Sequence, residues 1–101
     1  MPAIPTARVD HYAFSNEELR VRMAETLARV GRVDCADPAE VHEVCDEVRA
    51  LVARSHAHLG VEEMRRLLAL VEQLDHSWID ERRLAVMNVR RALQRAAGRA
   101  A

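Results

Sequence analysis

The stretch LVEQLDHSWIDERRLAVM, Leu70 to Met87, decides the fold of this chain. It lies between two segments that have a helical apolar period. In its middle, Asp75, His76 and Ser77 either end one helix or stand as weak interior residues of a longer one. A continuous helix predicts a long arm that needs a partner to cover it, whereas a turn predicts a compact bundle.

The apolar pattern favours one continuous helix from about 61 to 97. No Gly or Pro interrupts this range. At about 100° per residue, the apolar stripes on the two sides of residues 75–78 have nearly the same angular position, and a turn has no reason to preserve that phase. The stripes consist of Met64, Leu67, Leu68, Val71, Leu74 and Trp78, and of Ala85, Val86, Val89, Leu93 and Ala96.

The alternative is a break near 75–78. Ser77 and Asp80 have the spacing of a helix start signal, Ser-x-x-Asp. A break there divides 61–97 into two helices and predicts an up-down four-helix bundle, a common architecture at this length. Both interpretations give an all-α fold, because no stretch shows the alternation of a strand.

The first two helices have clear start signals. Ser15 with Glu18 forms a capping box, and Asp37 precedes Pro38 at a first helical position. We expect helices at about 15–30 and 38–59, each ended by the glycine that follows, Gly31 or Gly60. Residues 1–14 lack a helical period and are expected to form an extended N-terminal arm, and residues 15–101 a single helical domain.

Charge is nearly balanced overall but unevenly distributed. The net charge is −1, which argues against nucleic acid as a partner of the whole domain. Residues 1–77 contain 14 acidic residues against 9 arginines, whereas residues 78–101 contain 2 against 6, and the chain has no lysine. There are only two cysteines, no secretory signal and no apolar run of the length that spans a bilayer. The sequence therefore predicts a cytoplasmic protein with no membrane contact.

Two features predict an association surface. Asp75 and Arg82 fall inside the apolar stripe of the long helix, and a charge in such a seam is costly unless it is paired or sets register with a partner. Leu84 and Met87 lie off the main stripe, and a helix with two apolar patches often meets two neighbours. The predicted interaction residues are Tyr12, Phe14, Trp78, Arg82, Leu84, Met87, Arg91 and Arg95.

We therefore expect a non-enzymatic protein–protein interaction or self-assembly module that forms a homodimer or binds a larger protein. The sequence contains no nucleophile paired with a base and no phosphate-binding loop, so we do not expect an enzyme. No cofactor is expected either. One alternative is a metal- or cofactor-binding bundle, because His42 and Cys45 lie one turn apart and His76 and Asp80 also lie one turn apart. The other is a small nucleic-acid-binding regulator that uses the arginine-rich C-terminal helix.

Overall fold

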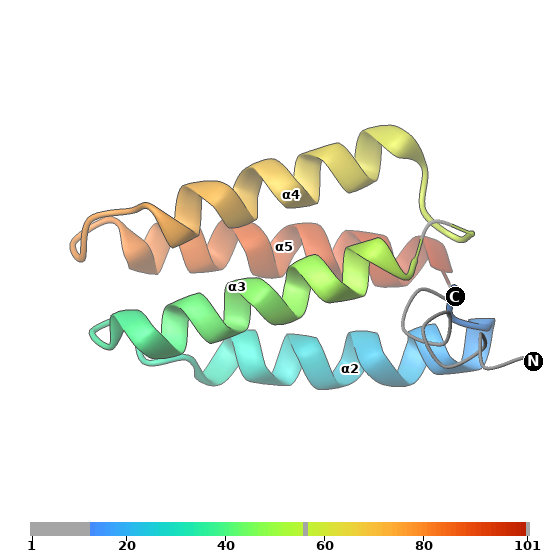
Figure 1. The fold of residues 1–101 in the computed structure, drawn as a ribbon, viewed down its shortest axis with the longest axis horizontal. Helices are drawn as coiled ribbons and strands as arrows, with labels where there is room; N and C mark the ends of the chain where they lie inside the picture. Colours follow the sequence, from blue (N-terminus) through green and yellow to red (C-terminus); the bar gives the residue numbers. More distant parts are fainter. Residues whose placement is uncertain (1–12, 56, 101) are drawn as a thin grey trace, which may run out of the picture.

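The computed structural model describes residues 13–55 and 57–100, and every regular element in these ranges is an α-helix. In chain order the helices are α2 (Asn16–Arg32), α3 (Pro38–Ala53), α4 (Val61–Asp75) and α5 (Arg82–Ala100). They run up and down in succession, with the loops 33–37 and 76–81 at one end of the bundle and the loop 54–60 at the other (Figure 1). The predicted all-α fold is confirmed, in its four-helix form.

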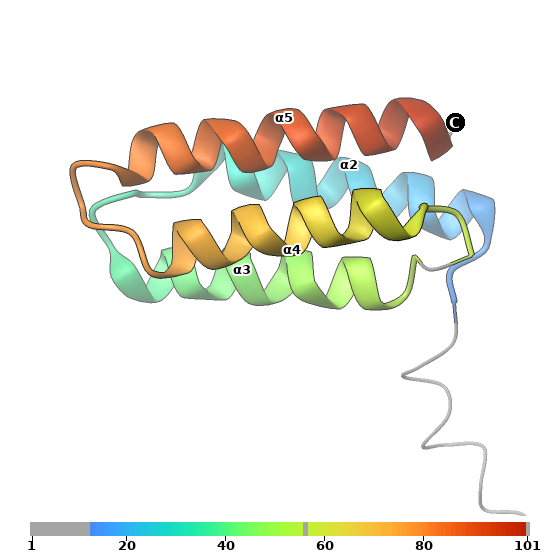
Figure 2. The same cartoon turned by 90° about the horizontal axis from the view of Figure 1, so that it is seen from above.

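The four helices close into a ring around one core. α2 packs against α3 and α5, and α4 packs against the same two helices (Figure 2). Each helix turns one apolar stripe inward, which is the arrangement that amphipathic helices of similar length favour. The core consists mainly of Leu19, Met23 and Val30 of α2, Val41, Val44, Cys45, Val48, Leu51 and Val52 of α3, Leu67, Val71 and Leu74 of α4, and Val89, Ala92, Leu93 and Ala96 of α5.

The helix starts of α2 and α3 are those that the sequence predicts. The Ser15 N–H donates to Glu18 Oε1 at 2.9 Å and the Glu18 N–H donates to Ser15 Oγ at 3.2 Å, which completes the capping box. At the start of α3, Asp37 Oδ1 accepts hydrogen bonds from the backbone N–H groups of Ala39, at 3.0 Å, and Glu40, at 3.4 Å. These local bonds satisfy donors that a helix start leaves unpaired.

The predicted helix ends were less accurate. α3 ends at Ala53, six residues before the expected end at 59. The buried Ser55 hydroxyl donates to the Leu51 carbonyl at 2.5 Å, a side-chain bond that competes with the helical ladder. Gly31 lies inside α2 and Gly60 caps the start of α4, and neither has a positive φ, so the expected left-handed stops were wrong.

The prediction of one long helix over 61–97 was also wrong, because the chain leaves the helical conformation within Leu70–Met87. α4 ends at Asp75 and α5 begins at Arg82. Ser77 does not cap α5; its hydroxyl donates to the Leu74 carbonyl at 2.7 Å and so satisfies an acceptor at the end of α4. The Glu81 N–H then donates to the Trp78 carbonyl at 2.9 Å, which closes the turn before α5.

The matching phase of the two stripes did not require one helix. An inward stripe is more than about 100° wide, so two independent helices agree in phase by chance roughly one time in three. The break lets α5 fold back against α4 and bury Val89 and Leu93 completely. Burying two such side chains stabilises the fold by about 3–6 kcal/mol. The helix propensities of residues 75–77 change the folding free energy by only a few tenths of a kcal/mol each, so burial decides where the chain turns.

Candidate functional site

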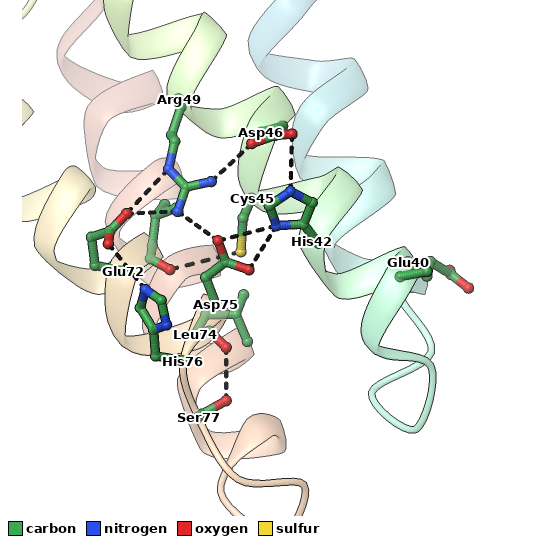
Figure 3. Close-up of polar contacts among 12 residues, drawn as sticks. Glu40, His42, Cys45, Asp46, Arg49, Glu72, Leu74, Asp75, His76 and Ser77 are labelled. Atoms are coloured by element: carbon green, nitrogen blue, oxygen red, sulfur yellow. Dashed lines mark hydrogen bonds and ion pairs between the residues drawn. The ribbon is translucent and has the colours of Figure 1, made fainter.

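A cluster of charged side chains joins α3 to α4 on the surface of the bundle (Figure 3). Its centre is the Arg49 guanidinium of α3, which donates to Asp46 at 2.9 Å, to Glu72 at 2.6 Å and to Asp75 at 2.7 Å. His42 of α3 lies beside Asp75, with its Nδ1 3.0 Å from the Asp75 carboxylate. We call these five residues the Arg49 cluster.

Asp75 is the least exposed carboxylate of the Arg49 cluster, with 12% of its side-chain surface accessible. Burial by itself opposes ionisation of this carboxyl, but the hydrogen bonds from Arg49 and His42 outweigh it, so the pKa of Asp75 is lowered from its ordinary value. The hydrogen bond from Arg49 likewise lowers the pKa of Glu72. Asp75 is therefore ionised at neutral pH and is paired within its own chain.

His42 lies between two carboxylates. Its Nδ1 faces Asp75, and its Nε2 lies 3.4 Å from Asp46 Oδ2. Only the protonated imidazolium can donate from both ring nitrogens, so the arrangement favours the charged form. The hydrogen bond to Asp75 and the charge of Asp46 raise the pKa of His42.

Cys45 faces the core instead of the charged surface. The side chain is buried, and its thiol donates to the Val71 carbonyl at 3.7 Å. Burial raises the pKa of the Cys45 thiol to about 12. A thiol that stays protonated is a poor nucleophile and a poor metal ligand, so Cys45 acts here as a small apolar core residue.

The structure does not bring the predicted metal ligands together. His42 is held by Asp75 and Asp46, whereas His76 lies 3.4 Å from Glu72 Oε2, and Asp80 is exposed in the loop after α4. Within residues 13–55 and 57–100, no three His, Cys, Asp or Glu side chains converge as a metal site. The geometry gives the metal-binding alternative no support.

The two charges that interrupt the predicted stripe are both satisfied within the chain. Asp75 pairs with Arg49 across 26 residues of sequence, and Arg82 donates to the Cys35 carbonyl at 2.9 Å. The second bond ties the start of α5 to the loop between α2 and α3. Asp75 and Arg82 therefore give no support to a register-setting contact with another chain. Arg82 stabilises the fold through its bond to the Cys35 carbonyl.

Large apolar side chains are exposed where the chain leaves α4 and enters α5. Trp78 has 76% of its surface accessible, Leu84 62% and Met87 44%, and Ile79 is exposed as well. The expectation that Trp78 packs in the middle of a stripe was wrong, since the residue lies in the loop. Among the described residues, four of the seven exposed large hydrophobic side chains thus fall in this part of the chain, which we call the 78–87 segment.

Exposed arginines lie beside the apolar side chains of α5. The helix contains six arginines and no acidic residue. Leu84 and Met87 share the outer side of the helix with four exposed arginines, none of which forms an ion pair with any residue that the structure describes. We call these six residues the α5 face: Arg83, Leu84, Met87, Arg90, Arg91 and Arg95.

The N-terminal interaction residues have a different outcome. Phe14 is buried in the core, and the Arg54 guanidinium lies 4.2 Å from the centre of its ring. The Phe14 N–H donates to the Arg54 carbonyl at 2.8 Å, and its own carbonyl accepts from His58 Nε2 at 2.7 Å. Phe14 is therefore a structural residue and not part of a free surface. Tyr12, like residues 1–12 of the expected arm, lies outside the described residues.

Sequence reasoning missed Ile79 as an exposed residue and Arg49 as the centre of a cluster. A signal existed for Arg49, because it lies at the edge of the apolar face of α3 just as Asp75 interrupts the face of α4. Two interruptions of opposite charge on neighbouring helices indicate a pair. Ile79 carried a weaker signal, because it lies between two helices only in the alternative with a break near 75–78.

Comparison with models of protein families, with curated protein sequences and with solved structures found no match to this chain. Within the residues that the structure describes, no helix is both long enough and apolar enough to cross a membrane.

Proposed function

We propose that this chain is a non-enzymatic module that acts by binding protein through the exposed side of α5 and the loop before it. The observation that carries the proposal is the concentration of exposed apolar side chains in the 78–87 segment of a bundle whose own core is well formed. Scattered exposed hydrophobic residues are normal on soluble proteins, but a local group of them commonly marks a binding surface.

The energetic reason is the apolar area that a partner would remove from water. Covering Leu84 and Met87 contributes about 1–2 kcal/mol each, given that both side chains are already partly buried. Trp78 adds a large and rigid side chain of the kind that is enriched among the residues with the greatest effect on binding. A partner is either a second copy of this chain, in a homodimer, or a larger protein.

The test compares two variants in which an exposed apolar residue is replaced by serine. Leu84→Ser alters the proposed surface, and Val21→Ser alters another exposed position, on α2. We expect wild type and Val21→Ser to have a solution mass above the 11.4 kDa of one chain, or to capture the same proteins from a lysate, and Leu84→Ser to lose that property. Monomeric mass together with identical captured proteins for all three would contradict the proposal.

A further inference from the structure

We propose that the partner of the α5 face is an amphipathic helix of another protein, with acidic residues flanking its apolar stripe. The inference rests on the proposed function and adds the chemistry of the partner. It starts from geometry: at 100° per residue, the six residues of the α5 face fall within about 140° of the helix circumference. They therefore form one continuous face directed away from the core.

The apolar part of the α5 face continues into a groove. Met87 lines a groove of about 440 Å³ between α5 and the end of α2, with Val30, Val33 and Val86 among its walls. Leu84 lies one turn before Met87 on the same side of the helix. Two apolar side chains one turn apart, beside a groove with a partly apolar lining, match the spacing at which a second helix inserts its own side chains.

The charge of the α5 face is not compensated by the elements packed against it. On the α2 side, the groove at Met87 is lined by Arg83 and Arg90 against a single acid, Asp34. On the α4 side, a second groove contains two glutamates, but they are outnumbered by three arginines, Arg65, Arg66 and Arg95. The field over α5 is therefore positive along both flanks, and an acidic partner complements it.

A second copy of the chain fits this surface less well than an acidic helix does. In a two-fold dimer the same face meets itself, so the arginines of one α5 would oppose those of the other. Like charges across an interface oppose association. A helix with glutamate or aspartate on both sides of an apolar stripe places carboxylates where the unpaired guanidinium groups can bind them in bidentate geometry.

Nucleic acid is also disfavoured as the partner. Phosphate would engage the arginines, but it makes no use of Leu84 and Met87, which occupy the same face. A ligand that covers both the apolar side chains and the arginines has an apolar centre and anionic edges, which is the pattern of an amphipathic acidic helix. Such edge charges also select partners in paired helices.

The experiment titrates the full-length protein with three helical peptides that share one leucine stripe and carry Glu, Gln or Lys at the flanking positions. A duplex DNA and a dilution series of the protein alone complete the set. We expect the Glu peptide to bind at least about tenfold more tightly than the Gln peptide, and to weaken as NaCl rises from about 50 to about 300 mM. The Lys peptide should not bind measurably.

Matched variants locate the binding. Arg91→Glu should lower the affinity for the Glu peptide about fivefold or more. Arg20 is an exposed arginine on α2, and Arg20→Glu should change that affinity less than about twofold. Leu84→Ser should lower the affinity for the Glu and Gln peptides by the same factor. Val21→Ser is its control and should leave both affinities unchanged.

The outcomes separate this inference from the proposed function. Equal binding of the Glu and Gln peptides, or a dimer that buries the α5 face and excludes all peptides, would overturn the acidic partner while protein binding stands. Binding of DNA that Leu84→Ser leaves unchanged, with no peptide bound, would overturn both. Absence of any peptide binding by a monomeric protein would overturn the acidic partner, whereas the comparison of mass and captured proteins between Leu84→Ser and Val21→Ser decides the proposed function.

Discussion

Arg49 holds three carboxylates that would otherwise repel one another across the seam between α3 and α4. The guanidinium fork spans Asp46, Glu72 and Asp75, which come from two helices. Most of these groups are well exposed, so the surface contacts contribute little individually. Asp75 is different because it is mostly buried, and a buried carboxylate that loses its partner is costly.

We expect Arg49→Met to lower the free energy of unfolding by about 1–2 kcal/mol, because Asp75 keeps only His42 as a charged partner. Arg49→Lys retains the charge without the fork and should cost less. The control Arg20→Met removes an exposed arginine and should be nearly neutral. Urea melts followed by circular dichroism measure all three, and equal stability of Arg49→Met and Arg20→Met would show that the cluster does not stabilise the fold.

His42 makes the stability of the bundle depend on pH. The pKa of His42 is raised in the folded protein above its ordinary value, chiefly by the hydrogen bond to Asp75. A raised histidine pKa means that the folded state binds the proton more tightly, so its contribution is complete below about pH 6.5 and is lost as the pH rises through the folded pKa. The carboxylates of the cluster act in the opposite sense and only at acid pH, because their pKa values are lowered.

The free energy of unfolding should therefore decrease from pH 6 to pH 8, and His42→Gln should reduce that decrease. Urea midpoints at several pH values in this window test the prediction. A His42→Gln variant with the same pH dependence as wild type would show that the interaction of His42 with Asp75 and Asp46 is not maintained in solution.

At the scale of the element, the break between α4 and α5 is the feature on which the architecture depends. Ile79 occupies the second position of the turn that the Glu81 N–H closes onto the Trp78 carbonyl. Proline is favoured at this position of a turn, and within the described residues the Ile79 N–H donates no hydrogen bond that proline would remove. In a continuous helix the same substitution would cost about 3 kcal/mol or more.

We expect Ile79→Pro to cost less than about 1 kcal/mol of folding free energy, since the side chain is also exposed. Gln73→Pro is the control, because this exposed residue lies inside α4 and should cost about 3 kcal/mol or more. If thermal unfolding shows equal and large losses for both variants, residues 76–81 continue the helix.

The helix starts, which depend on a few neighbouring residues, were predicted from the sequence, whereas the glycine stops were wrong and the features that depend on distant contacts were not predicted. The caps at Ser15 and Asp37 are local hydrogen bonds, so the residue types and their spacing determine them. Whether the chain turns after Asp75 depends on the apolar surface that α5 buries against α2 and α4, which no local pattern contains. The same holds for the pairing of Asp75 with Arg49, across 26 residues of sequence.

The candidate site was predicted in part. Leu84 and Met87 lie off the main stripe, and their exposure follows from that position alone. Arg91 and Arg95 are exposed for the same reason. Phe14 and Arg82 could not be assigned correctly, because their roles come from contacts with Arg54 and Cys35 on other parts of the chain.

At the scale of the whole molecule, the four helices form a complete core, and one side of α5 lies outside it. Its core is formed by all four helices, and within the described residues every buried side-chain nitrogen and oxygen has a hydrogen-bond partner. The α5 face, with its apolar side chains and with arginines that form no ion pair to the described residues, contributes little to that core. We therefore propose that this face is the surface that binds another protein.

The most direct measurement is photo-crosslinking in cells of the source organism, with a benzophenone side chain at position 87 and, as the control, at position 20 of α2. Both positions are exposed on a helix surface. We predict that illumination at position 87 converts the 11.4 kDa chain into a discrete, larger protein adduct, and that position 20 gives none. A chain that remains at its own mass after illumination at position 87, or that forms the same adducts from position 20, would contradict the claim.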